Sequence, residues 1–170
     1  MPCSIYLDSS VLCALADPPA RSGHARLCQQ LTRRWWRTLH TTRHLCTSEI
    51  ALQAIRHGPA NLASARLTRA EPLYILPVLP VFQQKAELLA SGGGLKSLKV
   101  GTEIACAAYF GTELYVTWSW CAIDALRLPQ LQRILAEAGL GNPQFITPLQ
   151  LLETEYETLS TAQKRGVPRT

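Results

Sequence analysis

The chain has 170 residues, of which 47% are hydrophobic and 17% are charged. This composition excludes a disordered chain, and the length is that of one domain, which we expect over residues 1–160 with a frayed tail at 161–170. No apolar run approaches the roughly 18–20 residues that span a bilayer, and the N-terminus lacks the basic start of a signal peptide. We therefore expect a cytoplasmic protein that does not contact a membrane.

Six cysteines are spread along the chain without a CxxC pair: Cys3, Cys13, Cys28, Cys46, Cys106 and Cys121. Zinc sites use close pairs, and disulfide frameworks belong to smaller secreted domains. We predict reduced cysteines that act as small core hydrophobes, which favours the cytoplasm.

The net charge of +5 is concentrated in the first 70 residues, which hold nine Arg and, as acids, only Asp8, Asp17 and Glu49. The other hundred residues carry a net charge of −1. A basic half indicates a polyanionic or an acidic partner, although a solvated helix face has the same composition.

In chain order, apolar runs predict strands and apolar residues at helical spacing predict helices. The elements expected in the first half are a strand at 5–7, a helix at 9–16, a helix at 22–39, a strand at 44–46, helices at 48–56 and 60–69, and a strand at 73–76. Those expected in the second half are a helix at 80–90, a loop at 91–94, a helix at 99–110, a strand at 114–117, a helix at 128–138 and a short strand at 144–146.

The end of this series has a clear helix start, because Thr147, Pro148 and Gln150 suit the N-cap, N1 and N3 positions of a last helix. Strands that alternate with helices indicate parallel pairing. In such sheets the working site lies beyond the carboxyl ends of the strands. No glycine-rich nucleotide-binding loop follows any predicted strand.

Five segments come in the order and spacing of a known group: IYLDSSVL, TRRWWR, CTSEIALQAIRHGPANLASARL, IACAAYFGTELYVTWSW and FITPLQLLE. They resemble bacterial PIN-domain proteins similar to the VapC-type toxins, whose segments read approximately YLDTSVL, TRRWW, SEIVLDEI, DALHIALA with TWNCRHIAN, and CTPEELL. The resemblance covers nearly the whole chain. It implies a three-layer α/β/α PIN-like fold with a mostly parallel sheet of four or five strands.

The resemblance also implies RNA cleavage with Mg²⁺ or Mn²⁺, held by a cluster of acids at the carboxyl edge of the sheet. A hard divalent cation binds carboxylate oxygens and water, and it activates a water for attack on phosphorus. Several carboxylates must converge, because one alone does not offset the hydration that the metal loses.

Most of that cluster is missing from this chain. Asp8, at the end of the first predicted strand, matches the first acid. The glutamate of the DEI motif falls at Ala54, and the aspartate that opens DALH falls at Val100. The Asn of TWN falls at Ser119, and the His of DALH becomes Glu103.

Two interpretations of Asp8 stay open. It caps the helix that begins at Ser9, which is favourable without a metal, or it forms a rebuilt metal site with Glu103 and with Asp124, whose loop has no predicted direction. Glu103 lies three residues, about one helical turn, beyond Val100, so its longer side chain can reach back toward the position of the missing aspartate. Glu49 should face elsewhere, since it lies about 140° around its helix from Ala54, the position of the missing glutamate.

Candidate RNA-binding residues are Arg33, Arg34 and Arg37, because arginines contact phosphates and the tryptophans among them, Trp35 and Trp36, can stack on bases. Adjacent helical residues point about 100° apart, so we expect one Trp in the core and the other at its boundary. The four histidines have no zinc-ligand spacing.

These observations favour a pseudo-nuclease of VapC-toxin ancestry that needs no cofactor and acts by binding. Its partner would be RNA, an acidic antitoxin-like protein, or a second copy in a homodimer. The alternative is an active Mg²⁺- or Mn²⁺-dependent endoribonuclease that uses Asp8 and Glu103. That alternative requires the two carboxyl groups to lie within about 8 Å of each other, close enough to share one ion.

Overall fold

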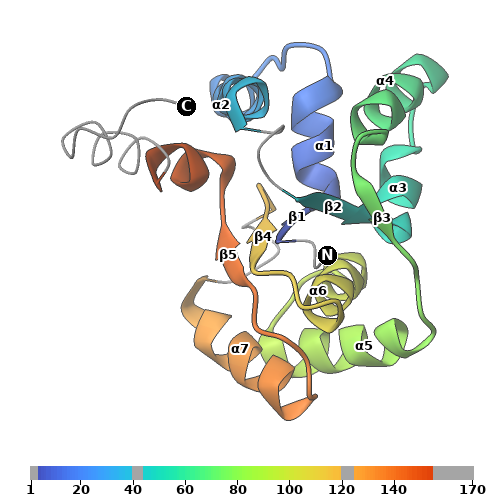
Figure 1. Ribbon diagram of the computed structural model, residues 1–170, viewed down its shortest axis with the longest axis vertical. Helices are drawn as coiled ribbons and strands as arrows, with labels where there is room; N and C mark the ends of the chain where they lie inside the picture. Colours follow the sequence, from blue (N-terminus) through green and yellow to red (C-terminus); the bar gives the residue numbers. More distant parts are fainter. Residues whose placement is uncertain (1–3, 40–43, 120–124, 155–170) are drawn as a thin grey trace.

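The protein is described by a computed structural model over residues 4–39, 44–119 and 125–154. A sheet of five parallel strands in the order β3-β2-β1-β4-β5 forms its centre (Figure 1). The strands are β1 Ile5–Leu7, β2 Leu45–Ser48, β3 Tyr74–Leu76, β4 Leu114–Val116 and β5 Gln144–Ile146. The predicted strands are thus all present, and their pairing is parallel throughout.

Helices cover both faces of this sheet and make three layers, α/β/α. The helices are α1 Ser9–Ala16, α2 Gly23–Leu39, α3 Glu49–Ile55, α4 Ala60–Ala70, α5 Val81–Gly93, α6 Leu98–Tyr109 and α7 Leu128–Glu137, with a 3-10 turn at Ala125–Arg127. In Figure 1, α1, α2 and α4 lie above the sheet, and α5, α6 and α7 lie below it. Within the described residues, no helix is long and apolar enough to cross a membrane.

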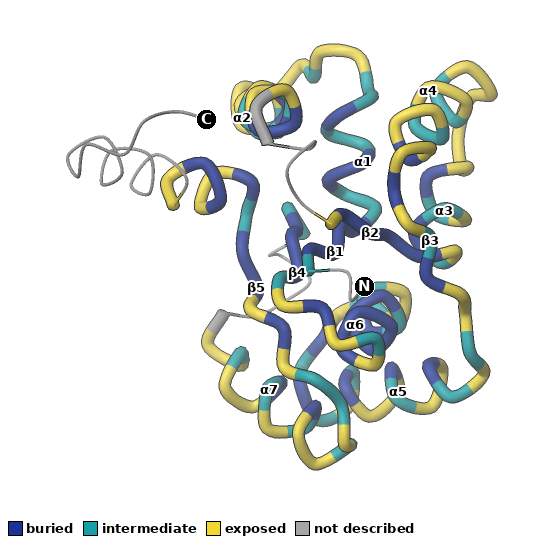
Figure 2. The backbone as a smooth tube through the Cα atoms, in the orientation of Figure 1, coloured by how far each residue is buried: buried dark blue, intermediate teal, exposed yellow. Residues whose placement is uncertain are grey.

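The alternation of side chains along the strands divides the core into two clusters, one on each face. Ile5 and Leu7 of β1 pack in the cluster under α1, α2 and α4, whereas Tyr6 packs in the cluster over α5, α6 and α7. Figure 2 shows the central strands β1 and β2 buried and the outer sides of the helices exposed, whereas the edge strands β3 and β5 each begin with an exposed residue. Both faces of the sheet are therefore dry, as expected for parallel strands between helices.

The prediction of a loop at 91–94 was wrong. α5 continues through Gly93 and ends at Gly94, which has the left-handed φ of 70° typical of a helix C-cap. The run of glycines lets α5 approach α7, because a Cβ on Gly93 would lie 2.9 Å from a methyl of Leu131. The glycines here permit close packing between two helices, which a single sequence does not distinguish from a flexible link.

The predicted start of the last helix is confirmed. Residues 148–154 are helical, the backbone N–H of Thr147 donates to Gln150 Oε1 at 2.7 Å, and the N–H of Gln150 donates to Thr147 Oγ1 at 3.2 Å. This reciprocal pair is a capping box. The predicted tail at 161–170 lies outside the described residues.

Candidate functional site

The candidate site lies at the carboxyl edge of the sheet, where β1 and β4 run side by side. Asp8 follows the last residue of β1, and Thr117 follows the last residue of β4. α6 lies against the same edge and brings Glu103 to the start of α1. The topology thus gathers residues that are more than a hundred positions apart in the sequence.

Asp8 is 2% exposed, and each of its carboxylate oxygens has a hydrogen-bond donor. Oδ1 accepts from the Ser10 N–H at 3.0 Å, from Ser10 Oγ at 2.5 Å and from the Val11 N–H at 3.1 Å. Oδ2 accepts from Thr117 Oγ1 at 2.6 Å. Asp8 is therefore the N-cap of α1, as one of the two sequence interpretations predicted.

Glu103 is 1% exposed and lies on the adjoining side of the α1 N-terminus. Its Oε2 accepts from the Ser9 N–H at 3.1 Å, and its Oε1 accepts from Ser9 Oγ at 3.0 Å. Two consecutive backbone N–H groups of one helix start, Ser9 and Ser10, thus point to two different carboxyl groups. Glu103 thus binds Ser9, the residue that follows Asp8.

Burial controls the protonation of this pair. It raises the pKa of Glu103 to about 8, and the charge of the neighbouring Asp8 adds to this shift. Burial also raises the pKa of Asp8, against hydrogen bonds from Ser10 and Thr117 that favour its charged form. Near neutral pH, burial therefore favours the protonated form of Glu103.

Aromatic rings line the sheet on the Glu103 side and keep water away. Tyr6 and Tyr115, on neighbouring strands, stack with ring centroids 5.2 Å apart. The Tyr6 hydroxyl is hydrogen-bonded to Ser48 Oγ at 2.6 Å, and the buried Tyr115 hydroxyl has no partner among the described residues. The charged state of Glu103 is costly beside these buried rings, which accounts for the direction of its pKa shift.

The described residues at this edge do not form a site that fits a divalent metal. Among the described residues, no group of three or more His, Cys, Asp or Glu side chains is placed to hold an ion. The two carboxyl groups already accept hydrogen bonds from protein donors. A hard cation needs several charged oxygens that are free to bind it. Asp124, the third acid considered, lies outside the described residues.

The positions of the lost acids are occupied by side chains with other roles. Val100 is half-buried and packs against the core on the α5–α7 side, and Ala54 lies in the last turn of α3. Ser119 is half-buried, and its N–H donates to Thr117 Oγ1 at 2.8 Å. Glu49 faces away from the site, as predicted, because it accepts from the Val78 N–H at 2.9 Å.

Sequence reasoning missed the hydroxyl network that closes the site. Ser10 Oγ both donates to Asp8 and accepts from the Trp118 N–H at 2.9 Å, and Thr117 bridges Asp8 and Ser119. The signal for these residues is present in the sequence: hydroxyl residues follow an aspartate at one strand end, and a threonine ends the parallel neighbour. They tie the carboxyl ends of β1 and β4 together.

The predicted RNA-binding arginines lie on α2, away from the carboxyl pair. Arg33 is half-buried, and Arg34 and Arg37 are exposed. The prediction for the tryptophans was wrong in part, because Trp35 and Trp36 are both buried, at 1% and 7% exposed. Their rings make an edge-to-face pair with centroids 6.2 Å apart, so α2 inserts both into the core.

Comparisons with known proteins identify no family for the chain: no family model matches it. A search of curated proteins finds no match either.

Proposed function

We propose that this chain is a PIN-like protein, of the ancestry of the VapC-type toxins, that binds RNA and does not cut it. The observation that carries this proposal is that protein donors already occupy the carboxyl groups of Asp8 and Glu103. Asp8 and Glu103 are buried and already bonded to protein donors, whereas a hydrolytic centre needs exposed carboxylate oxygens that are free to bind a metal.

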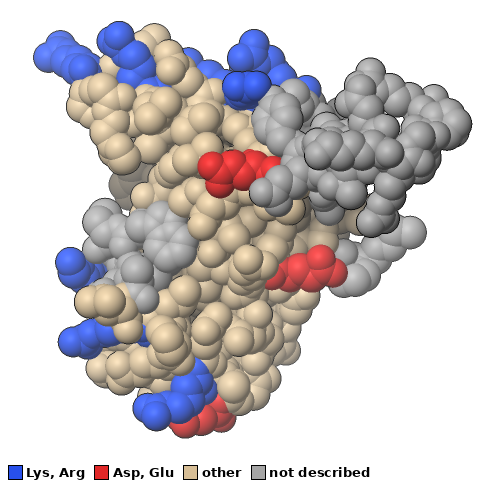
Figure 3. All heavy atoms as spheres, turned by 90° about the vertical axis from the view of Figure 1, so that its left-hand side faces the viewer, with Lys and Arg blue, Asp and Glu red and all other residues tan. Residues whose placement is uncertain are grey.

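The binding half of the proposal is supported by charge. Lys and Arg side chains gather along the top of the face in Figure 3, at the end of the molecule where α1, α2 and α4 lie in Figure 1. Such a surface attracts a polyanion without any catalytic group. An acidic antitoxin-like protein or a second copy of the chain are the competing partners. A cytoplasmic location accords with the free cysteines Cys13, Cys28, Cys46 and Cys106.

One observation favours the alternative of an active endoribonuclease. The start of α1 connects the two carboxyl groups through Ser9 and Ser10, so Glu103 does lie beside Asp8. A metal at this site would have to displace the serine and threonine donors and deprotonate Glu103. We therefore place this activity second.

Titration with Mn²⁺ by calorimetry separates the two functions. We expect no heat of binding for the wild-type chain at neutral pH and no Mg²⁺- or Mn²⁺-dependent cleavage of a structured RNA. The Asp8→Asn variant, whose side chain cannot ionise, should behave identically. Metal-dependent cleavage by the wild type that disappears in Asp8→Ala would show that the pair is catalytic.

A further inference from the structure

A hollow of about 410 Å³ opens on the same end of the molecule, between α1, α2 and α4. Its lining joins apolar and basic side chains: Leu15, Ala16, Trp36, Arg33, Arg37 and Arg69. None of these residues is acidic. The hollow is distinct from the carboxyl pair, because Ala16 lies about 10 Å along the axis of α1 from Ser9. Arg69, from α4, was not among the residues predicted to bind RNA.

Backbone oxygens hold two of the three guanidinium groups of this hollow, those of Arg33 and Arg37, in place. Arg33 Nε donates to the Leu15 carbonyl at 3.2 Å, and its Nη2 donates to the Asp17 carbonyl. Arg37 Nε donates to the Arg33 carbonyl at 3.2 Å, one turn back along α2. Arg33 therefore offsets the negative end of α1, which would otherwise repel an anion.

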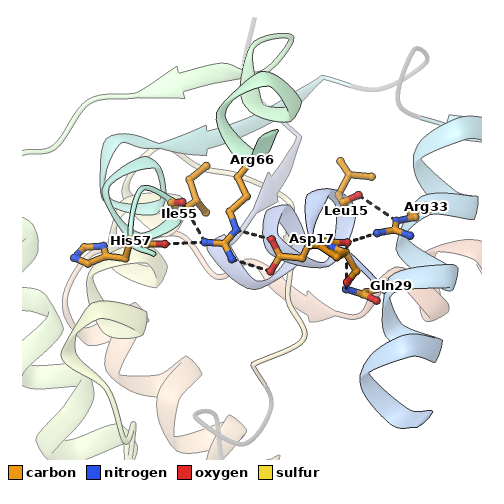
Figure 4. Close-up of polar contacts among 8 residues, drawn as sticks. Leu15, Asp17, Gln29, Arg33, Ile55, His57 and Arg66 are labelled. Carbon is orange, nitrogen blue, oxygen red and sulfur yellow. Dashed lines mark hydrogen bonds and ion pairs between the residues drawn. The ribbon is translucent and has the colours of Figure 1, made fainter. Parts of the chain in front are cut away.

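The nearest acid does not neutralise the hollow. Figure 4 shows the Asp17 carboxylate turned toward Arg66, on the side opposite Arg33. Arg66 Nε and Nη2 contact Asp17 Oδ1 and Oδ2 at 2.6 and 2.8 Å. Since Asp17 is already paired, the charge that faces the hollow is that of Arg33, Arg37 and Arg69.

We infer that this hollow binds a phosphate group, and that it anchors a backbone phosphate of single-stranded RNA. Guanidinium groups bind phosphate oxygens with paired hydrogen bonds, so arginines from two helices can surround one tetrahedral anion. The apolar floor of Leu15 and Trp36 suits the sugar beside it. This inference rests on the proposed RNA-binding function and gives that function a defined contact.

The test uses fluorescence anisotropy of a labelled single-stranded twelve-nucleotide uridine RNA and the full chain. Arg37→Gln/Arg69→Gln should weaken RNA binding about tenfold, because it removes two of the three charges that face the hollow. Both side chains are exposed, so we expect the variant to fold. Lys96→Gln/Arg133→Gln removes the same charge from exposed positions on the α5–α7 side and should change affinity less than twofold. The slope of log K against log salt should flatten by about 0.7 for each RNA phosphate that the variant no longer neutralises.

Further measurements distinguish binding of RNA from binding of a free phosphate compound or of an acidic peptide. Equal weakening in the two double variants would overturn the inference, since it would mean attraction by net charge alone. Binding of pyrophosphate that needs Arg37 and Arg69, without binding of RNA, would overturn the RNA function but leave the phosphate site standing. Failure of both to bind would overturn the site. Displacement of the RNA by a hexaglutamate peptide at a lower concentration than by pyrophosphate would overturn the choice of phosphate.

Discussion

The proton on Glu103 couples the candidate site to folding stability. Its pKa rises from an ordinary value of 4.5 to about 8, so the folded chain binds more protons than the unfolded chain between these values. The stability that this group contributes is complete below pH 4.5 and is lost as pH rises toward 8, with a slope of up to about 1.4 kcal/mol per pH unit. Asp8 shifts in the same direction.

Glu103→Gln should remove this dependence, because an amide cannot ionise and still accepts from the Ser9 N–H. Urea unfolding at pH 5, 6, 7 and 8 should show the wild type losing stability against the variant as pH rises. Glu137→Gln, at an exposed position of α7, is the control and should follow the wild type. Parallel profiles for wild type and Glu103→Gln would contradict the assignment of a buried proton.

Thr117 supplies the donor for the second oxygen of Asp8, at 2.6 Å. Thr117→Val keeps the shape but leaves a buried carboxylate oxygen unsatisfied, which costs about 1–3 kcal/mol of unfolding free energy. Thr117→Ser keeps the hydroxyl and should lose less. Denaturant midpoints of the three proteins check this order, and a valine variant as stable as the serine variant would mean that this hydrogen bond is dispensable.

How much of the site the sequence predicts depends on the distance over which its residues meet. The cap at Asp8 is predictable, since it needs only Ser10 and Val11 beside it. The contact between Glu103 and Ser9 is not predictable from the sequence, because the two residues are 94 positions apart and meet only once α6 lies against the sheet edge. Contacts between neighbouring residues, such as a helix cap, can therefore be predicted from one sequence. The burial that raises the pKa of Glu103 can be seen only in the tertiary structure.

At the scale of elements, an ion pair between α1 and α4 joins three segments of the upper layer. Arg66 binds Asp17 with two bonds and donates from Nη1 to the carbonyls of His57 at 2.9 Å and Ile55 at 3.3 Å (Figure 4). Both partners are more than half buried, with side chains 13% and 26% exposed. This geometry uses the planar fork of arginine, which lysine lacks.

Arg66→Lys should lower the unfolding free energy by about 1–3 kcal/mol, since the charge remains but lysine cannot form the paired bonds to Asp17 or reach both carbonyls. Arg69→Lys, on the same helix and exposed, is the matched control and should be neutral. The measurement is urea unfolding at low and high salt. Equal stability of the two variants would show that the Arg66 network makes no net contribution.

The elements were predictable where periodicity and end signals agree. Strands flanked by polar residues, such as β1 before Asp8, and the capping box at Thr147 appear at the expected places. The glycines of α5 were misread, because their role is set by Leu131 on a helix 38 positions later. Packing between helices overrode local propensity there.

At the scale of the whole molecule, the fold brings the ends of β1 and β4 and Glu103, from the middle of α6, to one edge. A metal site at that edge would need ligands from several elements, and no single residue would form it. The triple variant Ala54→Glu, Val100→Asp and Ser119→Asn restores the acid pattern that the PIN resemblance implies. It tests the positional correspondence directly.

We expect the triple variant to bind Mn²⁺ with a measurable heat, where the wild type shows none. Without metal it should be less stable than the wild type, because the added carboxylates lie close to other carboxyl groups and the aspartate at position 100 loses the apolar packing of Val100. With Mn²⁺ present the melting temperature should rise, since an ion that binds only the folded state stabilises it by mass action. A neutral control, Ala54→Gln, Val100→Asn and Ser119→Asn, has nearly the same shape without the charge and should show neither effect. If the charged triple variant also fails to bind, the correspondence of these positions with the acids of PIN nucleases is wrong, and the ancestry argued from them is wrong with it.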